Sequence, residues 1–317
     1  MPARWSRNSR LKGPILLHIE TPLILHPGLS TSTRRIWLKL ENLQPSGSFK
    51  MRGMGLLCSQ AKAAGKRRVV CASGGNAGFA TAFVARLLDM QAEIVVPSTT
   101  PESTRKRIAA LGATVIVHGD VWDEANEHAL ALSASDEVEY VPAFDHPVLW
   151  EGHSTMIDEI VTVLPQVDAV VASVGGGGLL AGILTGLLRH GRTDCRVIAC
   201  ETTGAASFRA ALDAGHPVKL DRIDSIAKSL AALQVASWPV DAIKQFPHES
   251  VVLPDADAIM GVTRFADDHR QLVEPACGVS LAVGYLDHPA IAGAHDVVIV
   301  VCGGVSVDAR MVADWAG

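Results

Sequence analysis

The sequence has no apolar run long enough to form a membrane-spanning helix. Its longest apolar stretches, at 169–174 and 297–302, fall far short of the roughly 18–20 residues that such a helix needs. The first ten residues carry three arginines but lack the apolar core of a secretory signal. We therefore expect a cytoplasmic protein that starts with a short basic lead-in and has no membrane partner.

The sequence also lacks any block of like charge. The 28 lysines and arginines are offset by 33 aspartates and glutamates, which gives a net charge of −5 over 317 residues. A protein that binds the nucleic-acid backbone would gather basic residues in one tail or on one face, so we expect no nucleic-acid partner. Hydrophobic residues make up 48% of the chain, which is typical of a compact protein and excludes a disordered one.

Cysteine pairs of the Cys-x-x-Cys type are absent. The six cysteines are dispersed, at positions 58, 71, 195, 200, 277 and 302, which favours reduced thiols over a disulfide scaffold. The histidines are scattered as well, and His146 and His153 fall in a stretch with proline and glycine rather than in a helical His-x-x-x-His pattern. The sequence therefore predicts no transition-metal site.

Short apolar segments alternate with alanine-rich segments of helical spacing. Strands are predicted at 36–40, 68–72, 93–97, 114–117, 169–174, 196–200 and 297–302. Helices are predicted at 77–88, 102–111, 123–132, 179–188 and 255–268. This alternation predicts an α/β fold with mainly parallel sheets. The units form two clusters, which predict a large domain of residues 1–54 and 146–317 and a small inserted domain of residues 55–145.

A lysine stands where a helix is predicted to begin. Residues 46–48 form a turn of small side chains, and Lys50 falls in the first turn of the helix-like segment that follows. The helix dipole opposes a cation there, and the same field together with burial lowers the pKa of an amine. Such a lysine suits Schiff-base chemistry. Taken alone, the motif favours a solvated surface lysine.

A turn at 72–78 links a predicted strand to a predicted helix. Its sequence, Ala-Ser-Gly-Gly-Asn-Ala-Gly, directs several backbone N–H groups outward at the helix start. Such a turn binds a carboxylate or a phosphate. A tight structural turn would explain the glycines but not Ser73 and Asn76 together.

A second turn, at 173–179, contains four successive glycines. Without side chains, their backbone amides can close around a phosphate, and few packing roles need all four. The same residues also fit a dinucleotide fingerprint, with Glu201 about 20 residues further on. A nicotinamide-dependent oxidoreductase therefore remains an alternative on this motif alone.

Together, four ordered motifs resemble the fold-type-II pyridoxal-phosphate enzymes, and in particular the catabolic L-serine/L-threonine dehydratases. The motifs are Pro45-Ser-Gly-Ser-Phe-Lys50, Ser73-Gly-Gly-Asn-Ala-Gly78, Val174-Gly-Gly-Gly-Gly-Leu179 and Val301-Cys-Gly-Gly304. The likeness covers nearly the whole chain, including 144–147, 150–153 and 273–277. A dinucleotide site would usually lie at the first βα turn, so the fingerprint becomes a coincidence of the glycine run.

The resemblance implies a fold, a cofactor and a reaction. The fold is the open, two-lobed parallel-sheet architecture of the tryptophan synthase β subunit, and the cofactor is pyridoxal 5'-phosphate. The reaction is β-elimination of water from an amino-acid substrate, which converts L-serine to pyruvate and L-threonine to 2-oxobutyrate with release of ammonia. A homodimer is implied as well.

The resemblance also assigns roles around the cofactor. Lys50 would hold the cofactor aldehyde and, once released, take the α-proton of the substrate. Phe49 would pack beside the ring, and Asn76 would hydrogen-bond the ring hydroxyl. Cys302 would face the pyridine nitrogen as a neutral thiol, where many related enzymes have an aspartate. The phosphate would be bound by the amides of Gly175, Gly176, Gly177, Gly178 and Leu179.

The substrate and a cation are assigned in the same way. The substrate carboxylate would lie in the turn of Ser73, Gly74, Gly75, Asn76 and Ala77. Ser73 is also a candidate for passing a proton to the leaving hydroxyl, although the cofactor phosphate could do so instead. A monovalent cation such as potassium is implied at Glu201, Ala205 and Ser207. An ion pair between Glu201 and a nearby base is the alternative.

Some features leave alternatives open. Gly74 stands where the liver-type serine dehydratases have alanine, so the preference between serine and threonine is open. The chain stops soon after residue 302, and we expect no isoleucine feedback of the kind exerted through an added regulatory domain. A cysteine synthase or a D-amino-acid lyase remains possible, although cysteine synthases usually have threonine where this chain has Ala77. A catalytically silent binding protein is a further alternative.

Overall fold

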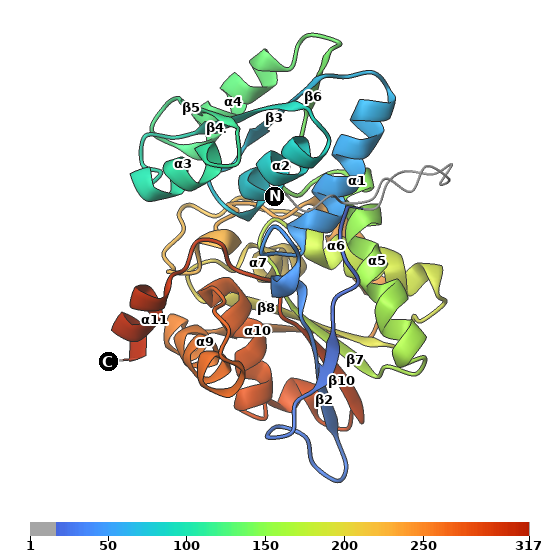
Figure 1. Cartoon of the computed structure of the whole chain (residues 1–317). Helices are drawn as coiled ribbons and strands as arrows, with labels where there is room; N and C mark the ends of the chain where they lie inside the picture. Colours follow the sequence, from blue (N-terminus) through green and yellow to red (C-terminus); the bar gives the residue numbers. More distant parts are fainter. Residues whose placement is uncertain (1–16, 317) are drawn as a thin grey trace, which may run out of the picture.

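The computed structural model describes residues 17–316, whose strands form two separate sheets (Figure 1). The predicted basic lead-in at 1–10 lies outside these residues. The larger sheet has the strand order β1 (Leu23–Leu25), β2 (Arg35–Lys39), β10 (Asp296–Val300), β7 (Ala169–Ser173), β8 (Arg196–Thr202), β9 (His248–Leu253). The smaller sheet has the order β5 (Thr114–Val117), β4 (Gln91–Val96), β3 (Arg68–Ala72), β6 (Val138–Tyr140).

Both sheets are parallel except at one edge. Within the described residues, only β1 pairs antiparallel with its neighbour, β2. The central strands β7 and β10 are buried at every position, as expected for strands covered on both faces. Each fully buried valine there stabilises the fold by roughly 1.5–3 kcal/mol relative to an exposed one. The prediction of an α/β fold with mainly parallel sheets is confirmed.

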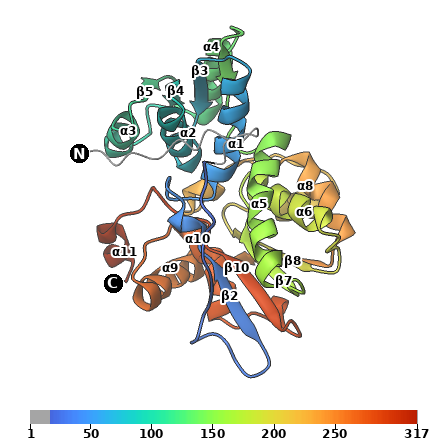
Figure 2. The same cartoon turned by 45° about the vertical axis from the view of Figure 1, so that its right-hand side comes forward.

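Helices cover both faces of the larger sheet. Figure 2 shows α5 (Pro147–Val163) and α6 (Gly178–Arg189) on one side, and α9 (Asp255–His269) and α10 (Pro275–Tyr285) on the other. The remaining α-helices in residues 17–316 are α1 (Lys50–Ala63), α2 (Asn76–Leu87), α3 (Glu102–Ala109), α4 (Trp122–Leu132), α7 (Ser207–Ala214), α8 (Ser237–Ala242) and α11 (Ala309–Ala316).

The smaller sheet comes from a continuous stretch of chain between β2 and β7. Helix α1 leads from the region of the larger sheet to that of the smaller one (Figure 1), and it runs without a break through the predicted domain boundary at 54/55. The domain limits of 1–54 with 146–317, and of 55–145, remain a prediction.

All seven predicted strands and all five predicted helices are present, with ends within two positions of those predicted. Three strands were not predicted: β1 and β6 have only three residues each, and β9 is half-exposed at the sheet edge. The interpretation of the stretch around His146 and His153 as non-helical is wrong. His146 is the N-cap of α5 and His153 lies inside this helix. Pro147 does not break the helix, because it occupies the first turn, where proline is tolerated.

The six cysteines are all buried and none forms a disulfide, as the sequence predicts. Across residues 17–316, no helix combines the length and the apolarity that crossing a membrane requires.

Candidate active site

Lys50 is the first residue of α1, as the sequence predicts. The turn before it contains Gly47 at φ +78°, a left-handed conformation that suits glycine. The Lys50 amine donates a hydrogen bond to the backbone carbonyl of Ala143 and lies 5.0 Å from the centre of the Phe49 ring. Burial lowers the pKa of Lys50 to about 8. Near neutral pH, roughly a tenth of this amine is therefore unprotonated and nucleophilic, far more than for a lysine at its usual pKa of 10.5.

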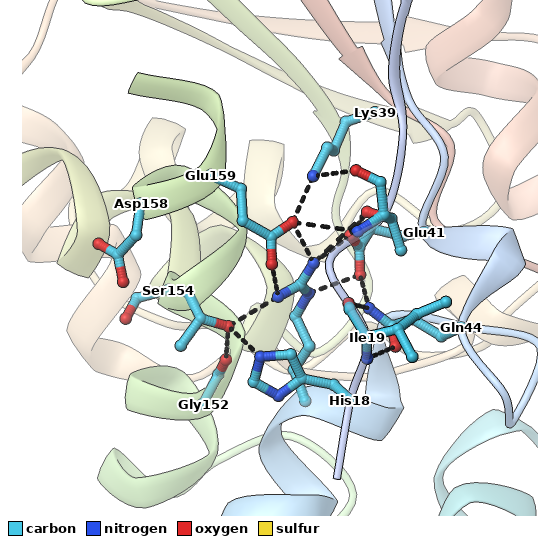
Figure 3. A network of polar contacts seen from close by, with 12 residues as sticks. His18, Ile19, Lys39, Glu41, Gln44, Gly152, Ser154, Asp158 and Glu159 are labelled. Carbon is cyan, nitrogen blue, oxygen red and sulfur yellow. Dashed lines mark hydrogen bonds and ion pairs between the residues drawn. The ribbon is translucent and has the colours of Figure 1, made fainter. Parts of the chain in front are cut away.

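A buried ion network fixes the start of α1 (Figure 3). The guanidinium of Arg52 pairs with Glu41 and with Glu159 of α5, at 2.7 Å in each case, and Lys39 also pairs with Glu159. Arg52 and Glu41 are completely buried. Breaking such a pair leaves an uncompensated charge at a cost of about 3–5 kcal/mol, so the network rigidly positions the helix turn that carries Lys50.

The four-glycine turn connects β7 to α6. A Cβ at Gly176 would lie 2.4 Å from the Phe144 ring, and one at Gly178 would lie 2.8 Å from the Phe144 carbonyl oxygen. Gly177 has φ +92°. No residue with a side chain fits these positions, and the turn ends at the N-terminus of α6. The backbone amides therefore form an uncharged anion site of the kind that binds phosphate.

One short segment links Lys50 to this turn. Ala143 accepts the hydrogen bond from the Lys50 amine, and its neighbour Phe144 packs on Gly176 and Gly178. The candidate covalent lysine and the candidate phosphate site therefore lie on the two ends of the same dipeptide. A small molecule carrying both an aldehyde and a phosphate could reach both.

The turn at 73–77 opens α2. The Gly75 amide donates to the Ser73 hydroxyl oxygen at 3.2 Å, and a Cβ at Gly78 would lie 1.8 Å from the Ser73 carbonyl oxygen. A Cβ at Gly74 would lie 2.8 Å from the side-chain methyl group of Thr100. A side chain at position 74 would therefore press first on Thr100 rather than project freely.

Asn76, the first residue of α2, contacts three segments. Its amide nitrogen donates to the Glu274 carboxylate at 2.6 Å and lies 3.3 Å from the Ser229 hydroxyl. Its amide oxygen accepts a hydrogen bond from the Val305 backbone at 3.2 Å. Ser229 also borders the glycine turn, because a Cβ at Gly175 would lie 2.8 Å from its carbonyl oxygen. Asn76 therefore lies next to the candidate phosphate site.

Cys302 follows β10 and is buried. Its carbonyl accepts a hydrogen bond from the Phe49 amide at 3.0 Å, and its sulfur lies 3.6 Å from the Ser173 hydroxyl. A hydrogen bond with the Cys277 thiol, together with burial, raises the pKa of Cys302 well above its usual value. The thiol is therefore neutral, and the backbone contact places Cys302 beside the Lys50 turn.

The candidate cation residues lie together near the end of β8. Both carboxylate oxygens of Glu201 accept hydrogen bonds from the first turn of α7, from the amides of Phe208 and Arg209 at 2.7 and 2.8 Å. Among residues 17–316 this carboxylate is held by backbone amides, and no ion pair with it is found, although the charge of Arg209 acts on it. Burial raises the pKa of Glu201 to about 7. Within residues 17–316 the buried hydroxyl of Ser207 has no hydrogen-bond partner, and a free oxygen of this kind can ligate a cation.

Sequence reasoning missed four residues that border the site. They are Thr100, Phe144, Ser229 and Glu274. Phe144 and Glu274 fall in motifs that carried the family resemblance, which was an available signal. The contacts of Thr100 and Ser229 depend on packing between distant segments, for which the sequence gives no local signal.

Comparison with known proteins agrees with this geometry. Residues 15–303 match the family described as "Pyridoxal-phosphate dependent enzyme". A human protein named "Serine dehydratase-like" is 44% identical over 303 residues, which is 92% of each chain. Human "L-serine dehydratase/L-threonine deaminase" is 42% identical over 302 residues, again 92% of each chain. The crystal structure of an L-serine ammonia-lyase from Rhizomucor miehei superposes with a TM-score of 0.88 at 37% identity, covering 95% of this chain and 98% of the other.

Proposed function

The chain belongs to the pyridoxal-phosphate dependent enzyme family, and we propose that it is an L-serine and L-threonine ammonia-lyase. It removes the α-proton and the β-hydroxyl of the amino acid, and the product hydrolyses to pyruvate or 2-oxobutyrate with release of ammonia. The family match removes the nicotinamide-dependent alternative. Relatives named as serine dehydratases and an L-serine ammonia-lyase support this reaction over the synthase and D-amino-acid alternatives.

One observation carries the proposal: the Lys50 amine and the glycine turn meet at the Ala143–Phe144 dipeptide. Pyridoxal phosphate fits this arrangement because it needs a nucleophilic amine for its aldehyde and a dense set of backbone donors for its phosphate. When bound, it supplies an electron sink for the pair left by α-proton removal. A silent binding protein would have no use for a buried lysine whose pKa is about 8.

The chain's own groups then have distinct tasks. The amides of Gly175, Gly176, Gly177, Gly178 and Leu179 hold the phosphate at the positive end of the α6 dipole. Phe49 would pack beside the cofactor ring, and Asn76 would donate to its hydroxyl. Lys50 tethers the cofactor and serves as the base that takes the α-proton, which a pKa near neutrality favours.

Cys302 would face the ring nitrogen of the bound cofactor. A thiol with a raised pKa stays neutral, donates at most a weak hydrogen bond and cannot stabilise a protonated ring nitrogen as a carboxylate does. With a neutral thiol at this place, the ring would draw in less negative charge, which would favour loss of the β-hydroxyl over reprotonation.

The turn at 73–77 binds the substrate carboxylate through its backbone amides and the Ser73 hydroxyl. Because the Ser73 oxygen already accepts the Gly75 amide, its own proton is free to be donated. Ser73 is the proposed donor of a proton to the leaving β-hydroxyl, and the cofactor phosphate is the alternative donor. Ala77 is buried in the first turn of α2, and its backbone amide would be part of this carboxylate site.

We propose that a potassium ion is bound here, with the Glu201 carboxylate, the Ala205 carbonyl and the Ser207 hydroxyl as its ligands. The unpartnered Ser207 hydroxyl supports this site, because hard cations prefer oxygen ligands. Activity is expected to rise when KCl replaces choline chloride at equal ionic strength, and Glu201→Gln should remove the difference. Equal stimulation of both proteins would contradict the site.

A homodimer and a cytoplasmic location remain proposals drawn from the family resemblance. Light scattering coupled to size-exclusion chromatography tests the first, with a mass of twice 33.5 kDa expected.

A substrate panel tests the proposed function. The holoenzyme is given L-serine, L-threonine, D-serine, or O-acetylserine with sulfide, and 2-oxo acid, ammonia and cysteine are measured. Equal amounts of 2-oxo acid and ammonia from the two L-amino acids are expected. Turnover of D-serine alone, or cysteine formation alone, would replace the proposal with one of its alternatives.

A further inference from the structure

Glu274 is a buried carboxylate at an unusual place. It is the N-cap residue of α10, where an acidic side chain normally accepts a hydrogen bond from its own helix. Its side chain makes no such bond. It is 3% exposed and reaches instead across to Asn76 at the start of α2.

The hydrogen-bond partners of this carboxylate are neutral donors. One oxygen accepts from the Asn76 amide and the other from the Ser306 hydroxyl, at 2.6 Å in each case. Burial raises the pKa of Glu274, and the hydrogen bonds from Ser306, Ser229 and Asn76, together with the positive charge of Lys50, partly offset this rise. Keeping a carboxylate in such a place costs desolvation energy that an apolar side chain would not cost. A specific task for the carboxylate explains why it is there.

That task follows from the chemistry of the Asn76 amide. A carboxylate only accepts hydrogen bonds, so the NH2 end of Asn76 must face Glu274. A backbone N–H only donates, so the oxygen end must face Val305. Both ends of the amide are thereby fixed, and Asn76 cannot flip.

The second N–H of the Asn76 amide makes only a weak hydrogen bond. Its hydrogen-bond partner among the described residues is the Ser229 hydroxyl at 3.3 Å, a long contact next to the glycine turn. An N–H whose nitrogen is already bound at 2.6 Å to a carboxylate has a defined direction but a weak partner. It is ready to be taken by a stronger acceptor.

We propose that Glu274 is a positioning residue, which orients the Asn76 amide so that its second N–H is presented to the ring hydroxyl of pyridoxal phosphate. The inference rests on the proposed function for the identity of the cofactor. The orientation of Asn76 by Glu274 does not depend on it, so the two can fail separately.

Two substitutions of similar size separate orientation from packing. Glu274→Gln can still offer its carbonyl oxygen to Asn76 while its NH2 group faces the Ser306 hydroxyl, which can accept. Glu274→Met fills a similar volume but accepts no hydrogen bond. If the Met variant fails to fold, Glu274→Asp takes its place. Its carboxylate is one methylene group shorter and should no longer reach Asn76, so the result expected for the Met variant is expected for it as well.

The first measurement is the NMR spectrum of the asparagine side chains. The sequence has four asparagines, at 8, 42, 76 and 126, so selective 15N-asparagine labelling of the full chain gives four NH2 groups. Asn76→Ala assigns the one in question. The Asn76 NH2 should resist hydrogen exchange in the parent and the Gln variant, with or without cofactor, and lose that protection in the Met variant. An unchanged Asn76 signal in the Met variant would overturn the proposal.

The second measurement is a double-mutant cycle on the dissociation constant of pyridoxal phosphate. Glu274→Met should weaken binding about tenfold, in keeping with the loss of one oriented hydrogen bond, while the Gln variant stays within about twofold. In an Asn76→Ala background, Glu274→Met should have no further effect. The same weakening in both backgrounds would show that Glu274 does not act through Asn76, and would overturn the proposal even if the enzyme deaminates L-serine.

Discussion

The amine of Lys50 donates a hydrogen bond to the carbonyl oxygen of Ala143, 93 positions further along the chain. The next residue, Phe144, covers Gly176 and Gly178 of the four-glycine turn. One dipeptide therefore sets the distance between the lysine that tethers the cofactor and the amides that bind its phosphate. This relationship determines the first predictions below.

Replacement of Lys50 should stabilise the cofactor-free protein. The pKa of Lys50 is lowered from 10.5 to about 8 by burial, so the unfolded chain binds more protons between these pH values. The resulting loss of stability is fully present below pH 8 and disappears as the pH rises to 10.5. Lys50→Met should therefore be more stable than the parent by up to about 3 kcal/mol near neutral pH, and the gain should shrink in alkaline buffer.

Urea unfolding of both cofactor-free proteins across this pH range gives the measurement. Lys62→Met, a change at an exposed lysine of the same helix, is the matched control and should show no such pH-dependent gain. If the stability gain of Lys50→Met did not change with pH, burial would not lower the pKa of the Lys50 amine, and the prediction would be wrong.

Gly176→Ala should weaken cofactor binding. The added Cβ would lie 2.4 Å from the Phe144 ring, so either the ring or the turn must move. We expect the dissociation constant of pyridoxal phosphate to rise about tenfold or more, which corresponds to about 1.4 kcal/mol. Phe144→Ala in the same protein should recover part of the loss by removing the clash.

Gly55→Ala is the control for that experiment, since its Cβ meets only Leu17 at an ordinary 3.5 Å. Unchanged cofactor affinity in Gly176→Ala would exclude the turn from phosphate binding.

Gly74→Ala should shift the preference toward serine. The new methyl group would lie 2.8 Å from the Thr100 methyl group, so the turn that holds the substrate must move. A narrower pocket discriminates against the extra methyl group of threonine, and one methyl contact is worth about 1–3 kcal/mol. The ratio of kcat/KM for the two substrates measures the shift. Thr100→Ser should reverse it, and an unchanged ratio would show that this turn does not set the preference.

The sequence predicted the chemistry-bearing turns but not their surroundings. The lysine at the helix start and the two glycine turns were recognisable because each is a local pattern with a local structural meaning. Glu274 was not assigned, because its bond to Asn76 joins residues 198 positions apart. The error at His153 has a similar origin. Gly152 suggested a break in the helix, yet it lies inside α5. The glycine is needed there for close packing against α1, because a Cβ at this position would lie 2.6 Å from the Arg52 carbonyl oxygen.

Cys302→Asp should change the fate of the cofactor, whereas Cys302→Ser should not. A carboxylate beside the ring nitrogen raises the proton affinity of that nitrogen and strengthens the electron sink, whereas a hydroxyl is neutral like the thiol. More pyridoxamine phosphate per pyruvate is therefore expected from the Asp variant alone. If the parent and both variants formed the same amount of pyridoxamine phosphate per pyruvate, Cys302 would not lie beside the ring nitrogen.

The most direct test compares pyruvate formation from L-serine by the parent and by Lys50→Arg, both loaded with pyridoxal phosphate, in an assay coupled to lactate dehydrogenase. Arginine keeps the positive charge but stays protonated, so it can neither bond to the aldehyde nor take the α-proton. The parent should form pyruvate and ammonia in equal amounts, and the Arg variant should form neither above background. Pyruvate formation by the Arg variant at the parent rate, or none by the parent, would contradict the assignment of Lys50 and of the reaction.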